Sequence, residues 1–388
     1  MGWLCVGFSS LVLLAVVGRF LHGVVVGFGE YDPATAAVSG PVGPRIVNFF
    51  PDPPKRAGWS EDLTFGDPLA KRLRSELASG DWQGTQTALE GTRGDWAERE
   101  FLVDSFGDHP VFAGRERVLD AWLAGRPASS GTPEAALPLL ARGRWQIAAA
   151  WHARGSGQAS TVTEEGWKRF FALLNRAQQD FEAAAKLDPE DPTPWALQVI
   201  TGRGLQREKS EVQRVADEAL RRDRLCWSAN RMLLVALCRK WSGTHEAMFE
   251  HARKASRDAP EGHILHALIA QAHIERWLWA SGFATEKKDD PQWFGNSGKY
   301  FLDPAVKEEV VAAYARSLGS PRWRETKLAP HARNDFAWCF LQMGDVARAK
   351  VELERLGSRL TQTPWGFKGE TRAQVEAARK QVGLAPLA

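Results

Sequence analysis

The stretch that decides the fold reads AQQDFEAAAKLDPEDPTPWALQ over residues 177–198. Within it, Ala177, Phe181 and Ala184 follow one another at intervals of four and three, which places them on one stripe of a helix. The small alanines on that stripe allow a neighbouring helix to approach closely. Pro189 ends the helix, because proline cannot continue it and also restricts the residue before it. The pattern predicts a helix that packs along one side against another helix.

The same spacing returns in HEAMFEHARKASRDAPEG, residues 245–262. There Met248, Ala252 and Ala255 share one helical stripe, and Pro260 follows at the same interval. A third copy near the C-terminus adds a glycine turn between two helices and consists of Ala337, Phe340, Gly344, Ala349, Leu353 and Leu356. Repetition of one unit indicates a stack of similar helix pairs.

These intervals resemble the tetratricopeptide repeat (TPR), a helix–turn–helix unit of about 34 residues. In that pattern Ala177–Pro189 lies in a second helix, and Trp195 opens the next unit. The chain also resembles uncharacterised bacterial members of that type through the segment Lys240–Glu246, KWSGTHE. The resemblance covers about half of the chain. It implies an all-α fold, an α-solenoid of antiparallel helix hairpins, and no particular activity.

The composition is that of an ordinary soluble protein, with 25% charged and 44% hydrophobic residues. A chain of 388 residues is long for one small core, whereas a solenoid grows by stacking. The net charge of +3 is too small to indicate nucleic acid as the main partner. None of the four cysteines forms a CxxC pair, so we expect buried, reduced thiols.

The N-terminal segment 1–28 is strongly apolar apart from Arg19 and His22. From Trp3 to Phe28 it is long enough to span a hydrocarbon core of about 30 Å at about 1.5 Å per residue. Basic residues follow the apolar run and none precede it, which favours a membrane anchor with a cytoplasmic body over a secretory signal. A cleaved signal, and an apolar helix buried in an unanchored cytoplasmic protein, remain the alternatives.

Proline and glycine punctuation divides the rest of the chain. Two local signals are clear: Pro68 begins a helix that Gly80 ends, and Thr161 with Glu164 has capping-box spacing ahead of a long helix. The predicted units are a Pro/Gly-rich linker (29–62), divergent helical hairpins (63–160), a TPR-like core (161–282), an aromatic loop (283–303), and C-terminal TPR-like hairpins with a capping helix (304–388).

The loop 283–303 has no helical period, and loops of this length are either functional or disordered. Its aromatic residues, which include Trp293 and Phe294, are too many for plain disorder. We therefore expect the loop to pack back on the helices and consider it the first candidate for a partner contact. A crossover that only covers the stack is the alternative.

Histidine is the one residue type that suggests chemistry. His266 and His273 lie two helical turns apart, and with His263 and Glu275 they form a candidate metal site of a hydrolase-type enzyme. The TPR resemblance instead implies that His266 and His273 occupy positions of packing residues. Neither a phosphate-binding glycine loop nor a nucleophile elbow is present. The sequence therefore favours packing histidines, no cofactor and no enzymatic activity, with the metal site as the alternative.

Solenoids bind partners along the concave surface that their first helices line. The lining expected from the repeat register is mixed apolar and amide, which suits an extended peptide or a helix. Together with the loop, it gives the partner-binding candidates Asn230, Lys240, Gln271, Trp293, Phe294, Asn334 and Trp338. Their arrangement does not reproduce the family's clamp for a C-terminal carboxylate. We expect a non-enzymatic scaffold at the cell membrane that binds a protein or peptide, and no nucleic acid.

Overall fold

The computed structural model describes residues 61–107, 117–155, 162–241 and 243–387. These parts are helical, with no strand among them, which confirms the predicted all-α class. The α-helices are α2 (Pro68–Ser79), α3 (Gln83–Glu90), α4 (Trp96–Ser105), α6 (Arg117–Gly125), α7 (Ala136–Arg154), α8 (Glu164–Leu187), α9 (Thr193–Gly204), α10 (Lys209–Arg222), α11 (Trp227–Ala236), α12 (His245–Asp258), α13 (Leu268–Gly282), α14 (Pro304–Arg316), α15 (Ala329–Met343), α16 (Val346–Leu356) and α17 (Thr371–Gln381). The 3-10 helices are η1 (Ala128–Ser130), η2 (Pro133–Ala135), η4 (Arg239–Trp241), η5 (Ile264–Ala267), η6 (Ser297–Leu302) and η7 (Trp365–Lys368).

Local signals in the sequence set several helix ends. Pro68 begins α2 and Gly80 ends it with a φ of 100°, a left-handed conformation that glycine adopts readily. The predicted long helix is α8, but its capping residue differs from the prediction. The hydroxyl of Thr163, not that of Thr161, accepts a hydrogen bond from the backbone N–H of Gly166 at 3.0 Å. Thr161 lies outside the described residues.

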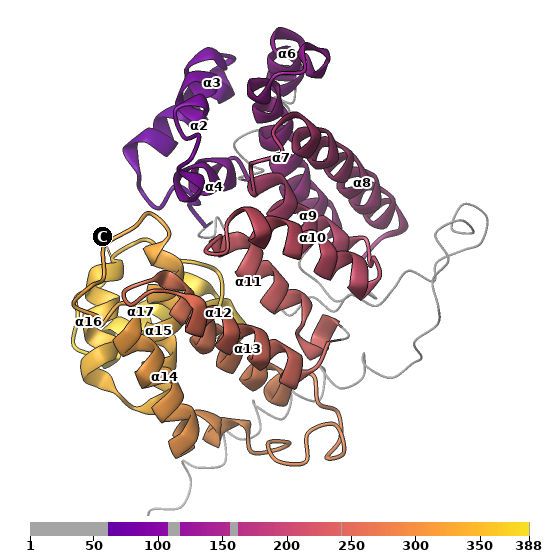
Figure 1. Cartoon of the computed structure of the whole chain (residues 1–388). Helices are drawn as coiled ribbons and strands as arrows, with labels where there is room; N and C mark the ends of the chain where they lie inside the picture. The colour runs from indigo at the N-terminus through magenta and orange to yellow at the C-terminus, as the bar shows by residue number, and fades with distance from the viewer. Residues whose placement is uncertain (1–60, 108–116, 156–161, 242, 388) are drawn as a thin grey trace, which may run out of the picture.

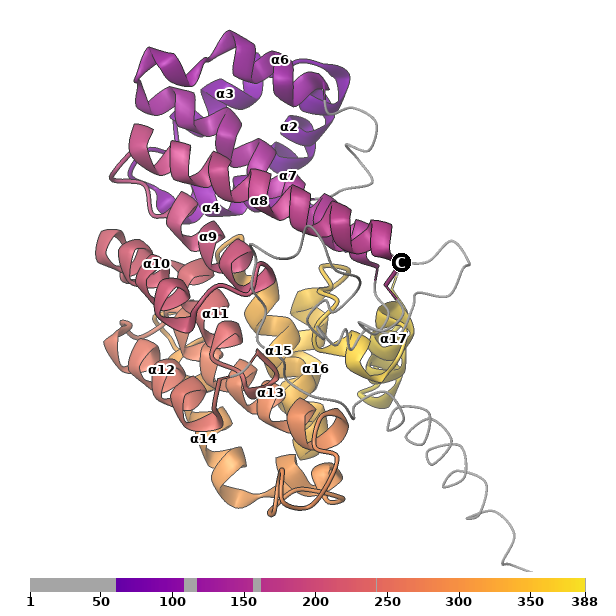
Figure 2. The ribbon, with the colours of Figure 1, turned by 90° about the vertical axis from the view of Figure 1, so that its right-hand side faces the viewer.

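Helices that follow one another in the chain pack side by side, as α7 does with α8, α9 with α10, α12 with α13, and α15 with α16. The chain runs from α2–α4 through α7–α13 and then returns (Figures 1 and 2). Lys327, between α14 and α15, forms ion pairs with the first described helices. Its Nζ lies 2.6 Å from Glu98 on α4 and 3.2 Å from Asp67 at the start of α2. The C-terminal part therefore contacts the first described helices.

Helix α15 lies at the centre of this arrangement, with thirteen of its fifteen residues buried. Trp338 meets Trp277 of α13 edge to face, with ring centroids 4.8 Å apart. Phe336 meets Tyr314 of α14 in the same way at 5.3 Å, and α16 covers a further side. A helix that is buried all round belongs to a core, so α15 joins the surrounding helices into one body.

The segment 283–303 packs back on the helices, as predicted. Tyr300 and Phe301 are buried, and Arg276 on α13 donates hydrogen bonds to both carboxylate oxygens of Asp290. Phe294 stays exposed. The loop therefore has a fixed arrangement, while its role as a partner contact stays a prediction.

Three cysteines, Cys226, Cys238 and Cys339, are buried free thiols, as the sequence predicted. The predicted anchor (1–28) and nearly all of the linker (29–62) lie outside the described residues. Across the parts of the chain that the structure describes, no helix combines the length and the apolar character needed to cross a membrane.

A buried carboxylate ties the N-terminal helices to α11. Glu100 of α4 accepts hydrogen bonds from the backbone N–H of Ser228 at 2.8 Å and from its hydroxyl at 2.6 Å. Ser228 lies in the first turn of α11, where backbone N–H groups have no partner within the helix. Burial raises the pKa of Glu100 to about 7, although the hydrogen bonds from Ser228 act in the opposite direction.

Replacing Trp338 by alanine tests the central position of α15. We expect Trp338→Ala to lower the free energy of unfolding by about 3 to 5 kcal/mol, because it leaves a cavity in a close-packed core. Urea unfolding followed by circular dichroism measures the change. Val346→Ala, on the exposed side of α16, is the control and should have a small effect. A neutral Trp338→Ala variant would contradict the packing described above.

The raised pKa of Glu100 predicts a pH dependence. Since the pKa is 4.5 in the unfolded chain and about 7 in the folded chain, the contribution of this carboxyl to stability is complete below pH 4.5. It is lost as the pH rises to 7, by up to about 3 kcal/mol at 1.36 kcal/mol per pKa unit.

Glutamine does not ionise, so Glu100→Gln should flatten the fall in unfolding free energy between pH 5 and pH 8. Urea unfolding at several pH values measures the profile. Glu165→Gln, on an exposed part of α8, should keep the wild-type profile. Equal slopes for wild type and Glu100→Gln would contradict the assignment.

Candidate functional site

Four of the predicted partner-binding residues lie in the interior. Asn230, Gln271, Asn334 and Trp338 are all buried. The side chain of Asn334 forms its hydrogen bonds within the chain. Its amide N–H donates to the carbonyl of Pro330 at 2.7 Å, and its amide oxygen accepts from the indole N–H of the buried Trp365 at 2.7 Å. The expectation that these side chains line an open groove is therefore corrected. Asn334 and Trp338 belong to helix α15, which the chain's own helices α13, α14 and α16 cover.

Two of the candidate metal ligands have local partners. His263 accepts a hydrogen bond from the backbone N–H of Leu265 at 3.2 Å. The ring nitrogens of His266 lie 2.9 Å from the hydroxyl of Ser256 and 2.9 Å from the carbonyl of Pro260. Burial lowers the pKa of both imidazoles, that of His263 to about 4. Both side chains therefore act as neutral packing groups with hydrogen bonds.

The other two candidates also have separate partners. His273 lies between the hydroxyl of Tyr300 at 2.7 Å and the carboxylate of Glu309 at 3.1 Å. Glu275 forms an ion pair with Lys240 at 2.6 Å. Lys240 was predicted to bind a partner, and its ammonium group contacts this carboxylate of the chain instead. Within the described ranges, no group of three or more His, Cys, Asp or Glu side chains is placed to hold a metal. The predicted cluster is not assembled.

An open cleft of about 520 Å³ lies between α16 and the turn that follows α14. The lining includes Val351, which is 40% exposed, and two aromatic rings. The residues that line the cleft are Tyr314, Leu318, Gly319, Ser320, Pro321, Trp323, Val351 and Arg355. Sequence analysis selected none of them. The only signal was the run PRWRETK at 321–327, in which cations alternate with a tryptophan.

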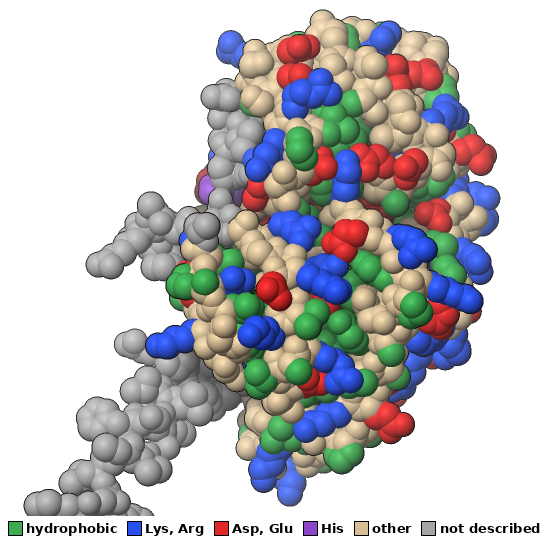
Figure 3. Space-filling model, turned by 90° about the vertical axis from the view of Figure 1, so that its left-hand side faces the viewer, with side chains coloured by type: hydrophobic (Ala, Val, Ile, Leu, Met, Phe, Trp, Pro, Cys, Tyr) green, Lys and Arg blue, Asp and Glu red, His purple; other side chains and the backbone are tan. Residues whose placement is uncertain are grey.

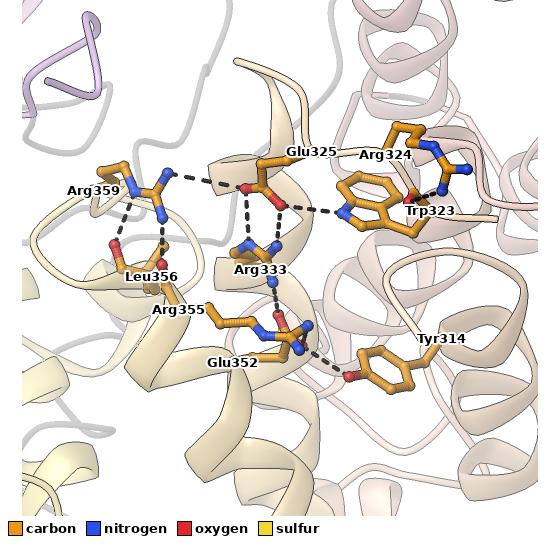
Figure 4. Close-up of polar contacts among 9 residues, drawn as sticks. All are labelled: Tyr314, Trp323, Arg324, Glu325, Arg333, Glu352, Arg355, Leu356 and Arg359. Atoms are coloured by element: carbon orange, nitrogen blue, oxygen red, sulfur yellow. Dashed lines mark hydrogen bonds and ion pairs between the residues drawn. The ribbon is translucent and has the colours of Figure 1, made fainter. Parts of the chain in front are cut away.

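A network of ion pairs, buried at Arg333 and Glu352 and exposed at Glu325, orients the two aromatic rings (Figure 4). Arg333 of α15, almost fully buried, pairs with Glu352 of α16 and with Glu325. The hydroxyl of Tyr314 donates to Glu352 at 2.8 Å. The indole N–H of Trp323 donates to Glu325 at 3.1 Å. One guanidinium therefore fixes two carboxylates, and each carboxylate orients one ring of the cleft.

Arg333, Tyr314 and Glu325 each keep one protonation state near neutral pH. Burial acts to lower the pKa of Arg333, but the hydrogen bond to Glu325 and the charge of Glu352 outweigh it and raise the pKa. Burial and the nearby charge of Glu352 raise the pKa of Tyr314, so this phenol stays neutral. For Glu325, burial is outweighed by hydrogen bonds from Arg333 and Trp323, which lower its pKa. Such an arrangement is suited to holding side chains in place.

Positive charge exceeds negative charge at the cleft. Arg324, Arg333, Arg355 and Arg359 lie in the same part of the structure as Glu325 and Glu352 (Figure 4). Arg355 and Arg359, 54% and 36% exposed, reach those carboxylates only at 4.0 Å. Arg324 donates to the backbone carbonyl of Trp323 at 3.0 Å. When the exposed Glu354 is added to Glu325 and Glu352, these four arginines still outnumber the carboxylates by one.

The excess of positive charge extends over the face of the molecule that carries α16. Figure 3 shows Lys and Arg side chains in the majority over the lower half of this face, with apolar side chains between them. Between residues 304 and 388 the sequence has fourteen Lys and Arg against nine Asp and Glu. The cleft can therefore receive an anionic group against two fixed rings.

Comparisons with protein-family models, with curated proteins and with solved structures found no match to this chain. Its function is therefore argued from the fold and the cleft.

The buried pair predicts an asymmetry between single and double replacements. Arg333→Met leaves Glu352 buried without its guanidinium, which should lower the free energy of unfolding by about 3 to 5 kcal/mol. Arg333→Met with Glu352→Leu removes both charges and should recover at least half of that loss. Urea unfolding measures both variants.

Lys254→Met is the control, because Lys254 pairs with Asp258 on the exposed side of α12 and water screens that pair. A single Arg333→Met variant as stable as the Lys254→Met control would contradict a supporting role for the network.

Proposed function

We propose that this chain is a non-enzymatic protein–protein interaction scaffold, built as a TPR-like α-solenoid and tethered to the cytoplasmic membrane by residues 1–28. The observation that carries the proposal is the cleft between α16 and the turn after α14. Its rings are oriented by the two carboxylates that pair with the buried Arg333, its lining includes the cation Arg355, and it is open to solvent. Preorganised side chains of this kind lower the entropy cost of binding.

The packing of the helices supports the solenoid part of the proposal. Besides its sequential neighbours α8 and α10, α9 contacts α11, as expected when one helix pair stacks on the next. The chain departs from an open solenoid where α15 enters the centre. This departure moves the proposed contact surface from the inner side to the cleft.

Exposed apolar side chains next to the cleft support a contact with protein. Val346 and Val351 of α16 are both exposed, and Val351 lines the cleft. Single exposed apolar side chains are common, but an apolar patch rimmed by charged groups is typical of a contact surface. Phe294 and Leu302 are exposed in the loop after α13 and offer a second, smaller apolar contact.

Site-specific crosslinking tests the proposal. A photoreactive amino acid replaces Val351 in the full-length chain, produced in its own cells, and a second chain carries it at the exposed Arg214 of α10. We expect discrete protein adducts from position 351 and not from position 214, detected by a mobility shift and mass spectrometry. The proposal fails when position 351 gives no adduct, or gives the same adducts as position 214.

A further inference from the structure

We infer, resting on the proposed function, that the cleft between α16 and the turn after α14 binds an internal, extended acidic segment of the partner protein, with one apolar side chain between its carboxylates. This assigns the chemistry of the partner from three features of the cleft. They are the orientation of its rings, the position of the arginines beside it and its open shape.

The rings offer the partner apolar surface. The hydroxyl of Tyr314 and the indole N–H of Trp323 already donate to Glu352 and Glu325. Their polar atoms are therefore engaged, and the ring carbons remain for contact. Together with the exposed Val351, the two rings form an apolar surface that one apolar or aromatic side chain of a ligand can contact.

Arginine side chains lie on two sides of this apolar surface. Figure 4 shows Arg355 and Arg359 on one side of Trp323 and Arg324 on the other. Arg355 reaches a carboxylate only at 4.0 Å, which is longer than a hydrogen bond, so its donors are available to a closer carboxylate. Arg359 already donates to the backbone carbonyls of Leu356 and Arg355. Cations on both sides of an apolar surface match acidic residues on both sides of an apolar residue.

The shape of the cleft favours a peptide chain over other anions. A small ligand gains affinity when a pocket encloses most of its surface, whereas this cleft is open to solvent. A C-terminal carboxylate supplies one anionic group at one end, but the cations lie on two sides. An extended chain places successive side chains about 3.3 Å apart along its axis and can reach both sides at once.

Peptide pools of defined composition test the inference on the immobilised full-length chain. One pool holds octapeptides with a central Phe or Leu between Asp and Glu residues, acetylated at the N-terminus and amidated at the C-terminus. The matched pool has Asn and Gln in place of Asp and Glu. We expect at least tenfold greater retention of the acidic pool at low salt. The difference should disappear in 1 M salt, where the screening length falls to about 3 Å.

Matched variants locate the binding. Arg355→Glu should lower retention of the acidic pool at least tenfold, and Arg355→Lys should keep part of it. Arg214→Glu makes the same change of charge on the exposed side of α10 and should have no effect. Equal thermal unfolding of the three variants shows that each is folded. Unchanged retention by Arg355→Glu would overturn the inference.

The remaining outcomes separate the two proposals. Equal retention of the acidic and amide pools, or binding to phosphatidylserine vesicles without retention of peptides, overturns the acidic-segment inference. Protein adducts at position 351 without peptide retention leave the scaffold function standing and reject only this inference. Absence of both adducts and peptide retention rejects both.

Discussion

The structure depends on the burial of helix α15 on every side. Because α13, α14 and α16 all pack on it, α15 converts a succession of helix pairs into one closed body. Aromatic contacts such as that of Trp338 with Trp277 supply the close packing. The ion pairs of Lys327 with Glu98 and Asp67 hold the segment that leads into α15 against the N-terminal helices.

A central helix that carries charged residues must have those charges compensated. Arg333 is compensated by Glu325 and Glu352, since a buried guanidinium without a partner is strongly destabilising. Two other polar residues of α15 respond to burial by favouring their neutral forms: the pKa of Asp335 rises to about 7, and that of His331 falls to about 3. The requirement to pair Arg333 thus brings together the elements that form the cleft, and the same carboxylates orient its rings.

Recognition by this chain is consequently expected on its outside. In an open solenoid, residues such as Asn334 would face a groove, but here Asn334 bonds to the chain itself. The cleft uses residues from the turn after α14 and from the exposed side of α16, which a repeat pattern leaves unconstrained. These positions can carry specific chemistry without disturbing the packing of alanines and aromatics on the buried stripes.

The sequence by itself determined the helical class, because helix formation follows from interactions within a few residues. The left-handed Gly80 after α2 acts locally, so this helix end could be recognised. The TPR resemblance implied packing roles for His266 and His273, and both side chains are buried.

Only the tertiary structure decided which surface stays open. The position of α15 rests on contacts between distant segments, such as that of Lys327 with Glu98, and helical periodicity has no information about them. For the same reason the predicted groove residues proved to be buried, and the cleft around Trp323 and Arg355 was not foreseen. A period of three to four residues indicates which side of a helix is covered, but the return of the chain determines what covers it.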